Sequence, residues 1–390
     1  MRRARSVERL ALRRENLIEV HEFQPHVADD ILQDLEKRLR RTLLPYDVGY
    51  GSWSHGTQHQ YLRQLLDYWL NEFNWRDQER LLARWKHFRV VIRGQELHFV
   101  RTIIGDGKKP LIMTHGWPST FFELTHLIGP LAEVMTGGGY ELVIPSLPGY
   151  AFSPGPPAPW QTPWIHELWK TLMVDVLGHE RFGAHGGDLG AGITAKLAMF
   201  HPEHVTGIHV TGVYAPGAES SADISMAELD HVERENRWEA EEGAYAHVQA
   251  TRPLTLAYSL TDSPAGLAAW IIEKFRSWSD CGGDVESRFT KEQLLTTVTL
   301  YWVTRSIATS FLPYFEARNN PDPVKWKSIE VPCAIALFPA DISAPPRAWA
   351  ERYYNVTRWT EMPAGGHFPA MEEPHLLAQD IETFFAGLEW

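Results

Sequence analysis

Hydrophobic residues near the start of the chain recur at helical spacing and then give way to strand-like runs. Residues 27–44 and 61–73 place apolar side chains three or four positions apart, which predicts two helices. Residues 87–93 and 96–103 are rich in β-branched and aromatic residues on either side of a Gly-Gln pair, which predicts a hairpin. We therefore expect a helical N-terminal segment over residues 1–86 that leads into a sheet.

From residue 111 onward, apolar runs of strand length alternate with amphipathic runs of helix length. The predicted strands cover residues 111–115, 141–146, 182–185 and 205–211, and the predicted helices cover residues 121–134, 164–177 and 191–200. Such alternation is typical of a mostly parallel sheet with helices on both faces. We therefore assign residues 87–213 to the first part of an α/β core.

The alternation stops after residue 211, where mainly helical patterns follow. Helices are predicted over residues 228–250, 267–278 and 293–308, before strands at 333–338 and 356–361 and a helix at 376–385. A helical block placed inside an α/β pattern indicates an insertion that covers the carboxyl edge of the sheet. We expect this helical lid over residues 214–312 and the second part of the core over residues 313–390.

Composition narrows the function mainly by exclusion. The formal net charge of -12 opposes binding to nucleic acid or to anionic lipid. Cys281 and Cys333 match neither a metal-binding spacing nor a disulfide framework. The chain has no run of ~18 to 20 apolar residues and no signal-peptide core, and residues 1–22 mix arginines with glutamates, as a solvated extension does. We therefore expect a soluble, cytoplasmic protein without a membrane anchor.

The sharpest local signal is the segment Gly186-Gly187-Asp188-Leu189-Gly190, which follows a strand pattern and precedes a helix pattern. Small residues there are typical of a nucleophile elbow. A carboxylate at the apex is ionised at neutral pH and can attack a saturated carbon, which leaves an ester on the enzyme. A helix cap without chemistry is the competing interpretation, because Asp is a favoured N-cap residue. Nucleotide binding is disfavoured, because the glycines do not match GxGxxG and no P-loop lysine follows.

Three further signals follow the chain order of a catalytic triad. The HGWP segment at residues 115–118 would bring the backbone N–H of Trp117 beside that of Leu189 in an oxyanion hole. Asp341 follows a late strand, and a GGHF segment presents His367 on a glycine-rich loop as a general base. The order nucleophile, acid, histidine predicts an α/β-hydrolase fold with a helical lid insertion and a helical N-terminal extension.

Taken together, HGWP, GGDxG, the late carboxylate and GGHF resemble the epoxide hydrolase family. The N-terminal stretches at residues 53–57, 68–69 and 73–76, and the lid stretch at residues 262–269, look like the microsomal and juvenile-hormone branch. The similarity runs from about residue 23 to the C-terminus. It implies hydrolysis of a small-molecule epoxide by water to a vicinal diol, with no metal or organic cofactor.

The resemblance also implies roles for individual residues. Asp188 would be the nucleophile, His367 the base and Asp341 the acid that orients it. Two lid tyrosines would donate to the epoxide oxygen, and by position these are Tyr245 and Tyr314. The same lid contains two rival candidates, Tyr258 and Tyr301.

Two positions depart from the family pattern. Leu189 stands where the family usually has Trp, which changes the packing beside the nucleophile, and Asp341 stands where many relatives have the longer Glu. A haloalkane dehalogenase and a catalytically inactive fold used as a binding module remain as alternative functions. The oligomeric state stays open, with a homo-oligomer among the options.

Overall fold

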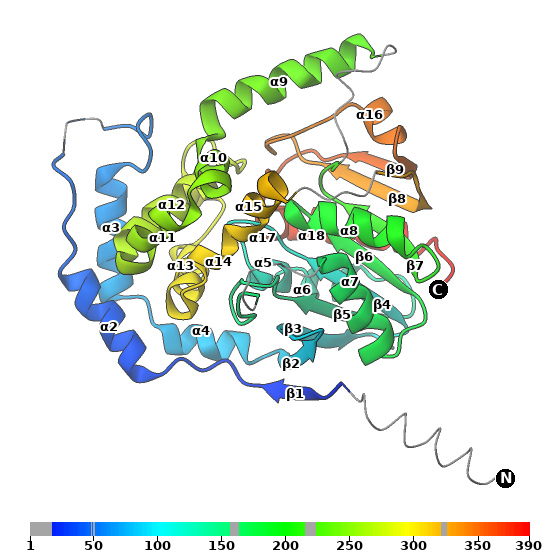
Figure 1. Cartoon of the computed structure of the whole chain (residues 1–390), viewed down its shortest axis with the longest axis horizontal. Coiled ribbons are helices and arrows are strands. Elements are labelled where there is room, and N and C mark those ends of the chain that lie inside the picture. Colours follow the sequence, from blue (N-terminus) through cyan, green and yellow to red (C-terminus); the bar gives the residue numbers. More distant parts are fainter. Residues whose placement is uncertain (1–17, 48, 50, 157–163, 215–223, 321–325) are drawn as a thin grey trace, which may run out of the picture.

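The computed structural model describes residues 18–47, 49, 51–156, 164–214, 224–320 and 326–390. Its core is a nine-stranded sheet in the order β1-β2-β3-β5-β4-β6-β7-β8-β9, with helices on both faces (Figure 1). The strands are β1 (Val20–Phe23), β2 (Lys86–Ile92), β3 (Gln95–Ile104), β4 (Lys109–Thr114), β5 (Tyr140–Pro145), β6 (Phe182–Gly186), β7 (Val205–Val210), β8 (Ile329–Leu337) and β9 (Tyr354–Glu361).

In the sheet order from β5 through β4 to β9, neighbouring strands are parallel. Strands β1, β2 and β3 form an antiparallel edge, and β3 joins this edge to β5. Every residue of β5, β6 and β7 is buried, as expected for parallel strands that helices cover on both faces. The covering helices are α5 (Phe121–Thr125), α6 (Ile128–Val134), α7 (Ile165–Lys170), α8 (Leu189–Phe200), α16 (Arg347–Glu351), α17 (Pro369–Glu372) and α18 (Pro374–Phe385). The predicted fold class is confirmed.

A block of helices follows β7 and forms a layer beside the sheet (Figure 1). Its members are α9 (Met226–Glu242), α10 (Ala244–Thr251), α11 (Pro253–Asp262), α12 (Pro264–Ser277), α13 (Lys291–Thr304), α14 (Ile307–Ser310) and α15 (Leu312–Asn319). The predicted helix over residues 293–308 is split at Arg305, whose left-handed backbone (φ 53°) ends α13. Because α15 packs against α10, the helical layer continues past the predicted boundary at residue 312.

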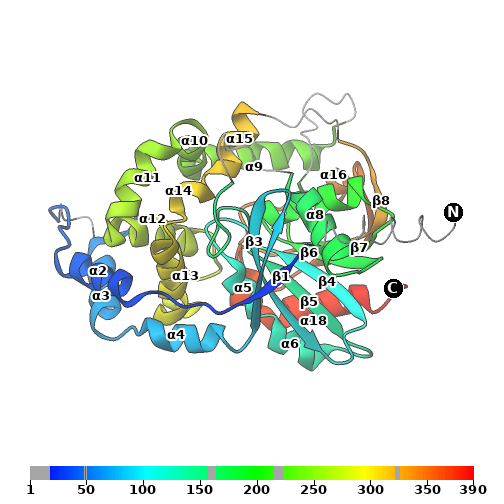
Figure 2. The same ribbon diagram turned by 60° about the horizontal axis from the view of Figure 1, so that its bottom comes forward.

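The N-terminal segment packs against this lid. Helices α2 (Asp29–Arg40) and α3 (His59–Asn71) contact α12, while α3 and α4 (Trp75–Leu82) contact α13, an arrangement visible in Figures 1 and 2. Thr57 Oγ1 donates a 2.7 Å hydrogen bond to the carbonyl of Ala269 on α12. The pattern predicted a helical segment, but part of this segment is a strand: β1 pairs with β2 at the edge of the sheet. The four residues of β1 are mostly exposed, so the sequence has no buried apolar pattern there that would predict a strand.

Candidate active site

The predicted elbow is a sharp turn between β6 and α8, with Asp188 at its apex. Asp188 adopts φ 51° and ψ -126°, a strained conformation for a residue with a side chain, and α8 begins at the next residue. The turn lies tightly against β4, because a Cβ atom at Gly190 would approach the carbonyl oxygen of Thr114 to 2.1 Å. Glycine is therefore required at residue 190, which explains the small residues of the motif.

Two backbone N–H groups hold the carboxylate of Asp188. The N–H of Trp117 donates to Asp188 Oδ1 at 2.8 Å, and the N–H of Leu189 is a second hydrogen-bond donor to the carboxylate. The HGWP segment comes this close because residue 116 has no side chain: a Cβ atom at Gly116 would lie 2.2 Å from Asp188 Oδ1. The structure thus brings together the two N–H groups that the sequence predicted, on the carboxylate itself.

The other oxygen of Asp188 faces His367. The distance from His367 Nε2 to Asp188 Oδ2 is 3.5 Å, and His367 Nδ1 lies 2.6 Å from Asp341 Oδ1. The backbone N–H of His367 donates to the carbonyl of Trp278 at 2.8 Å, which ties the histidine loop to the lid. Asp188, His367 and Asp341 therefore form one continuous row of side chains.

The pKa values of Asp188 and His367 are shifted in opposite directions by their surroundings. Burial raises the pKa of Asp188, but the imidazole of His367 and the two N–H donors outweigh burial and hold the pKa below the usual aspartate range. Burial lowers the pKa of His367, but the charges of Asp341 and Asp188 and the hydrogen bond with Asp341 hold it well above its ordinary value. Both shifts favour the charged pair, an Asp188 carboxylate beside a His367 imidazolium, over the neutral pair.

Two lid tyrosines lie beside this row. The ring of Tyr245, on α10, stacks on Trp117 with 5.1 Å between ring centroids, and Tyr314, on α15, meets Trp117 edge-on at 6.1 Å. Their hydroxyls are joined by a hydrogen bond. Burial raises the pKa of both hydroxyls and the charge of Asp188 raises it further, so both phenols stay protonated.

The two rival tyrosines are placed differently. Tyr258 is 75% exposed on the outer surface of α11. Tyr301 is buried, but its hydroxyl donates to the carbonyl of Ser119 at 3.0 Å. Neither hydroxyl is paired with the other lid phenols, which leaves Tyr245 and Tyr314 as the adjacent pair.

The sequence analysis did not identify Trp278 as part of the site. Its ring packs against Tyr245 at 4.9 Å and against His367 at 5.2 Å. It therefore buttresses both a lid phenol and the histidine. A tryptophan at the end of an amphipathic helix has no local signature that separates it from core packing.

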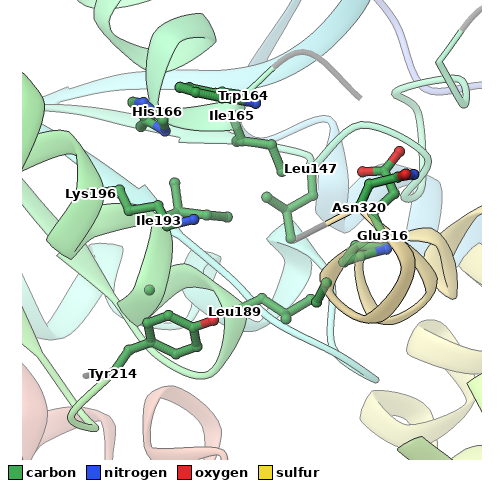
Figure 3. Close-up of a pocket in the computed structure, with 13 residues that line it drawn as sticks. Leu147, Trp164, Ile165, His166, Leu189, Ile193, Lys196, Tyr214, Glu316 and Asn320 are labelled. Atoms are coloured by element: carbon green, nitrogen blue, oxygen red, sulfur yellow. The ribbon is translucent and has the colours of Figure 1, made fainter. Parts of the chain in front are cut away.

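Leu189 opens onto a surface pocket of about 650 Å³ next to the elbow. In Figure 3 its side chain extends from the start of α8 toward Glu316 of α15. The rest of the lining is largely apolar, with Leu147, Ile165 and Ile193 among its members. The residue after Asp188 therefore forms part of the wall of this pocket.

Within the part of the chain that the structure describes, no group of three or more His, Cys, Asp or Glu side chains is arranged to hold a metal ion. Cys281 and Cys333 are both buried free thiols. Among the same residues, no helix has both the length and the apolar character needed to cross a membrane.

Comparison with known proteins identifies the family. Residues 20–124 match the family model described as the epoxide hydrolase N terminus, and residues 109–246 match the alpha/beta hydrolase fold. The chain is 31% identical to epoxide hydrolase 1 of the rabbit Oryctolagus cuniculus, over 95% of this chain and 89% of the rabbit protein. It is 34% identical to juvenile hormone epoxide hydrolase 2 of Ctenocephalides felis, over 92% of this chain and 84% of that protein.

A solved structure is similar over nearly the whole chain. The juvenile hormone epoxide hydrolase of the silkworm Bombyx mori superposes with a TM-score of 0.86 at 27% identity, covering 96% of each chain. The resemblance predicted from the motifs is thereby confirmed. The chain belongs to the epoxide hydrolase family of α/β-hydrolase-fold enzymes.

Proposed function

We propose that this enzyme hydrolyses small-molecule epoxides to vicinal diols in two steps, through a covalent ester on Asp188. One observation carries the proposal: Asp188 Oδ1 is held by the N–H of Trp117, whereas Oδ2 lies 3.5 Å from His367 Nε2. The two oxygens are therefore unequal. Oδ1 already occupies an oxyanion hole, and Oδ2 is the one left to attack.

In the first step, Asp188 Oδ2 attacks an epoxide carbon and the carbon–oxygen bond of the ring breaks. The leaving alkoxide is a strong base and needs a proton, which Tyr245 or Tyr314 supplies. Tyr245 is buried and Tyr314 is partly buried, and the raised pKa of each hydroxyl keeps both phenols protonated beside Asp188. The stacking of Tyr245 on Trp117 fixes its ring relative to the oxyanion hole, so that the donor is in place before the reaction begins.

In the second step, His367 removes a proton from water, and the water oxygen attacks the carbonyl carbon of the ester. The negative charge that develops on Oδ1 is stabilised by the N–H groups of Trp117 and Leu189. The bond between that carbon and Oδ2 then breaks, and the imidazolium of His367 gives its proton to Oδ2, which leaves with the diol. The new carboxyl group of Asp188 passes its remaining proton to His367, which restores the resting site. Asp341, 2.6 Å from His367 Nδ1, orients the imidazole and stabilises its cation.

His367 can return to the tyrosine the proton that the epoxide oxygen received in the first step. The charges of Asp341 and Asp188 hold the pKa of this histidine well above its ordinary value in the resting enzyme. Ester formation removes the charge of Asp188, so the pKa of His367 falls and its proton can replace the one that the phenol gave up. Neutral His367 is then the base that the second step requires. The same charge change that completes the first step thus prepares the second.

The tyrosine pair favours an epoxide over a haloalkane as the substrate. A departing halide needs no proton, whereas an alkoxide does. The negative charge of Asp188 raises the pKa of both hydroxyls, so two protonated donors are available next to the nucleophile. A catalytically inactive binding module would gain nothing from a strained apex at Asp188 (φ 51°).

The direct test is diol formation from styrene oxide and from aliphatic epoxides of graded size. The wild type should yield diol, and Asp188→Ala should yield none while still unfolding cooperatively, because the change removes the attacking oxygen and not an apolar contact of the core. Diol formation by Asp188→Ala at a rate near that of the wild type would refute the proposal.

A further inference from the structure

A small cavity lies between the elbow, the HGWP segment and the histidine loop. Its volume is about 20 Å³, and its polar lining includes Asp188, His367, Glu123, Ser119 and Thr211. A single water molecule requires roughly 10–15 Å³ and two to four polar partners. The cavity therefore has the size and the lining to hold one water molecule beside the carboxyl group of Asp188.

His367 lacks a partner on the side that faces this cavity. Its Nε2 atom is buried and has no hydrogen-bond partner within the described ranges of the chain. The 3.5 Å distance to Asp188 Oδ2 is longer than an ordinary hydrogen bond. Buried polar atoms are almost always satisfied by protein or by ordered water. A water molecule in the cavity would satisfy Nε2 at the position from which a base must act.

Glu123 is a second carboxyl group on the same cavity. It lies on α5, is 8% exposed, and has a hydrogen bond to the side chain of Ser119. It lines the same small cavity as Asp188 and His367, which places it close to the reacting groups. A carboxylate offers about four acceptor positions, so one bond to Ser119 leaves capacity for a water molecule.

Burying an ionised carboxyl group costs free energy, and the raised pKa of Glu123 reflects this cost. Burial raises the pKa of Glu123 to about 7, although Ser119 and His367 act in the opposite direction. A glutamine would fill the same volume without this cost. A buried acid at residue 123 therefore calls for an explanation that packing on α5 does not supply.

Resting on the proposed function, we propose that Glu123 positions the water molecule that hydrolyses the Asp188 ester. The water donates one O–H to the Glu123 carboxylate and the other to His367 Nε2, so that its oxygen points at the ester carbon. His367 takes the second proton, the water oxygen bonds to that carbon, and the ester bond breaks as His367 passes this proton to the departing diol oxygen. Glu123 gains and loses no proton in this step, so it is a positioning residue.

The proposal predicts an effect confined to the second step. Glu123→Gln and Glu123→Ala should form the ester at the wild-type rate and hydrolyse it about 10- to 100-fold more slowly, as expected when a reacting group is misplaced by about 1 Å. A carboxyl group that only stabilised α5 would slow both steps together. The rates are separated by rapid mixing with excess enzyme, followed by acid quench and intact mass spectrometry of the adduct.

Glu382 provides the matched control. It is 1% exposed and accepts hydrogen bonds from Thr136 and Tyr140, away from the cavity. Glu382→Gln should lower the unfolding temperature and leave the rate of ester hydrolysis unchanged. This variant measures what the loss of a buried carboxylate does when no catalytic water is involved.

The outcomes separate this proposal from the mechanism on which it rests. If His367→Gln accumulates an adduct on Asp188 but Glu123→Gln hydrolyses the ester within twofold of the wild-type rate, the role of Glu123 is refuted and the mechanism stands. A parallel loss of both rates in Glu123→Gln also refutes it. If no variant, His367→Gln included, ever forms an adduct, the covalent mechanism and the role of Glu123 fall together.

Discussion

The lid tyrosines give the sharpest prediction about the first step. Tyr245→Phe and Tyr314→Phe each remove one hydroxyl and leave the ring contacts with Trp117 in place. Each should slow ester formation, because the epoxide oxygen becomes negative in the transition state and loses a donor. Ester hydrolysis should change little, since the phenols act only on the leaving oxygen.

The expected loss in the rate of ester formation depends on both lid hydroxyls together. One preorganised donor in a buried site contributes about 2.7–4 kcal/mol, or roughly 10²- to 10³-fold in rate. The two hydroxyls are joined by a hydrogen bond, so either can partly replace the other. Each single variant should therefore lose less than this range, and the double variant should lose more than the product of the two single losses.

The assay is the rate of adduct formation in a single turnover, measured for Tyr245→Phe, Tyr314→Phe and the double variant. Tyr258→Phe is the control, because that hydroxyl lies on a side chain that is 75% exposed. Tyr301→Phe leaves the carbonyl of Ser119 without its 3.0 Å hydrogen bond, and should lower stability by about 1–3 kcal/mol. The reasoning is refuted if Tyr258→Phe or Tyr301→Phe slows ester formation more than the change at Tyr245 or Tyr314.

Three further changes probe the rest of the site. Gly116→Ala places a methyl group 2.2 Å from Asp188 Oδ1 and should lower kcat/KM on the order of 10²-fold, and a wild-type value would contradict the close approach. Asp341→Asn removes a charge that raises the pKa of His367, so the pH below which ester hydrolysis declines should move down and the plateau rate should fall by up to about 10⁴-fold. Leu189→Trp should fill part of the adjoining pocket and lower kcat/KM for bulky epoxides relative to small ones, and an unchanged ratio would show that substrates do not use this pocket.

The parallel core was predictable from the sequence because its strands are continuously apolar and its helices are amphipathic. The edge strand β1 was not, since its VHEF sequence is too short and too polar to stand out. The split of the predicted helix at residues 293–308 depends on Arg305, a residue type that rarely adopts a left-handed backbone. These features are decided by tertiary packing rather than by local pattern.

The site residues also divide into those that a local motif predicts and those that only the fold brings together. Asp188 and His367 stand in glycine-rich turns whose small residues have a local cause, so their motifs were visible. Trp278 and Glu123 have no such motif, and only the fold brings the first against His367 and the second into the cavity beside it. Choosing between lid tyrosines likewise required knowing that the hydroxyl of Tyr301 is occupied by Ser119.

The central claim is that Asp188 itself supplies an oxygen to the product. The most direct test is one turnover of the wild type in ¹⁸O-water with enzyme in excess over the epoxide. The diol should be unlabelled, because its new oxygen is Oδ2 of Asp188, and peptide mapping should find one ¹⁸O in the segment that contains Asp188. A first-turnover diol that carries ¹⁸O, with no label in the protein, would show that water attacks the epoxide directly and would contradict the covalent mechanism.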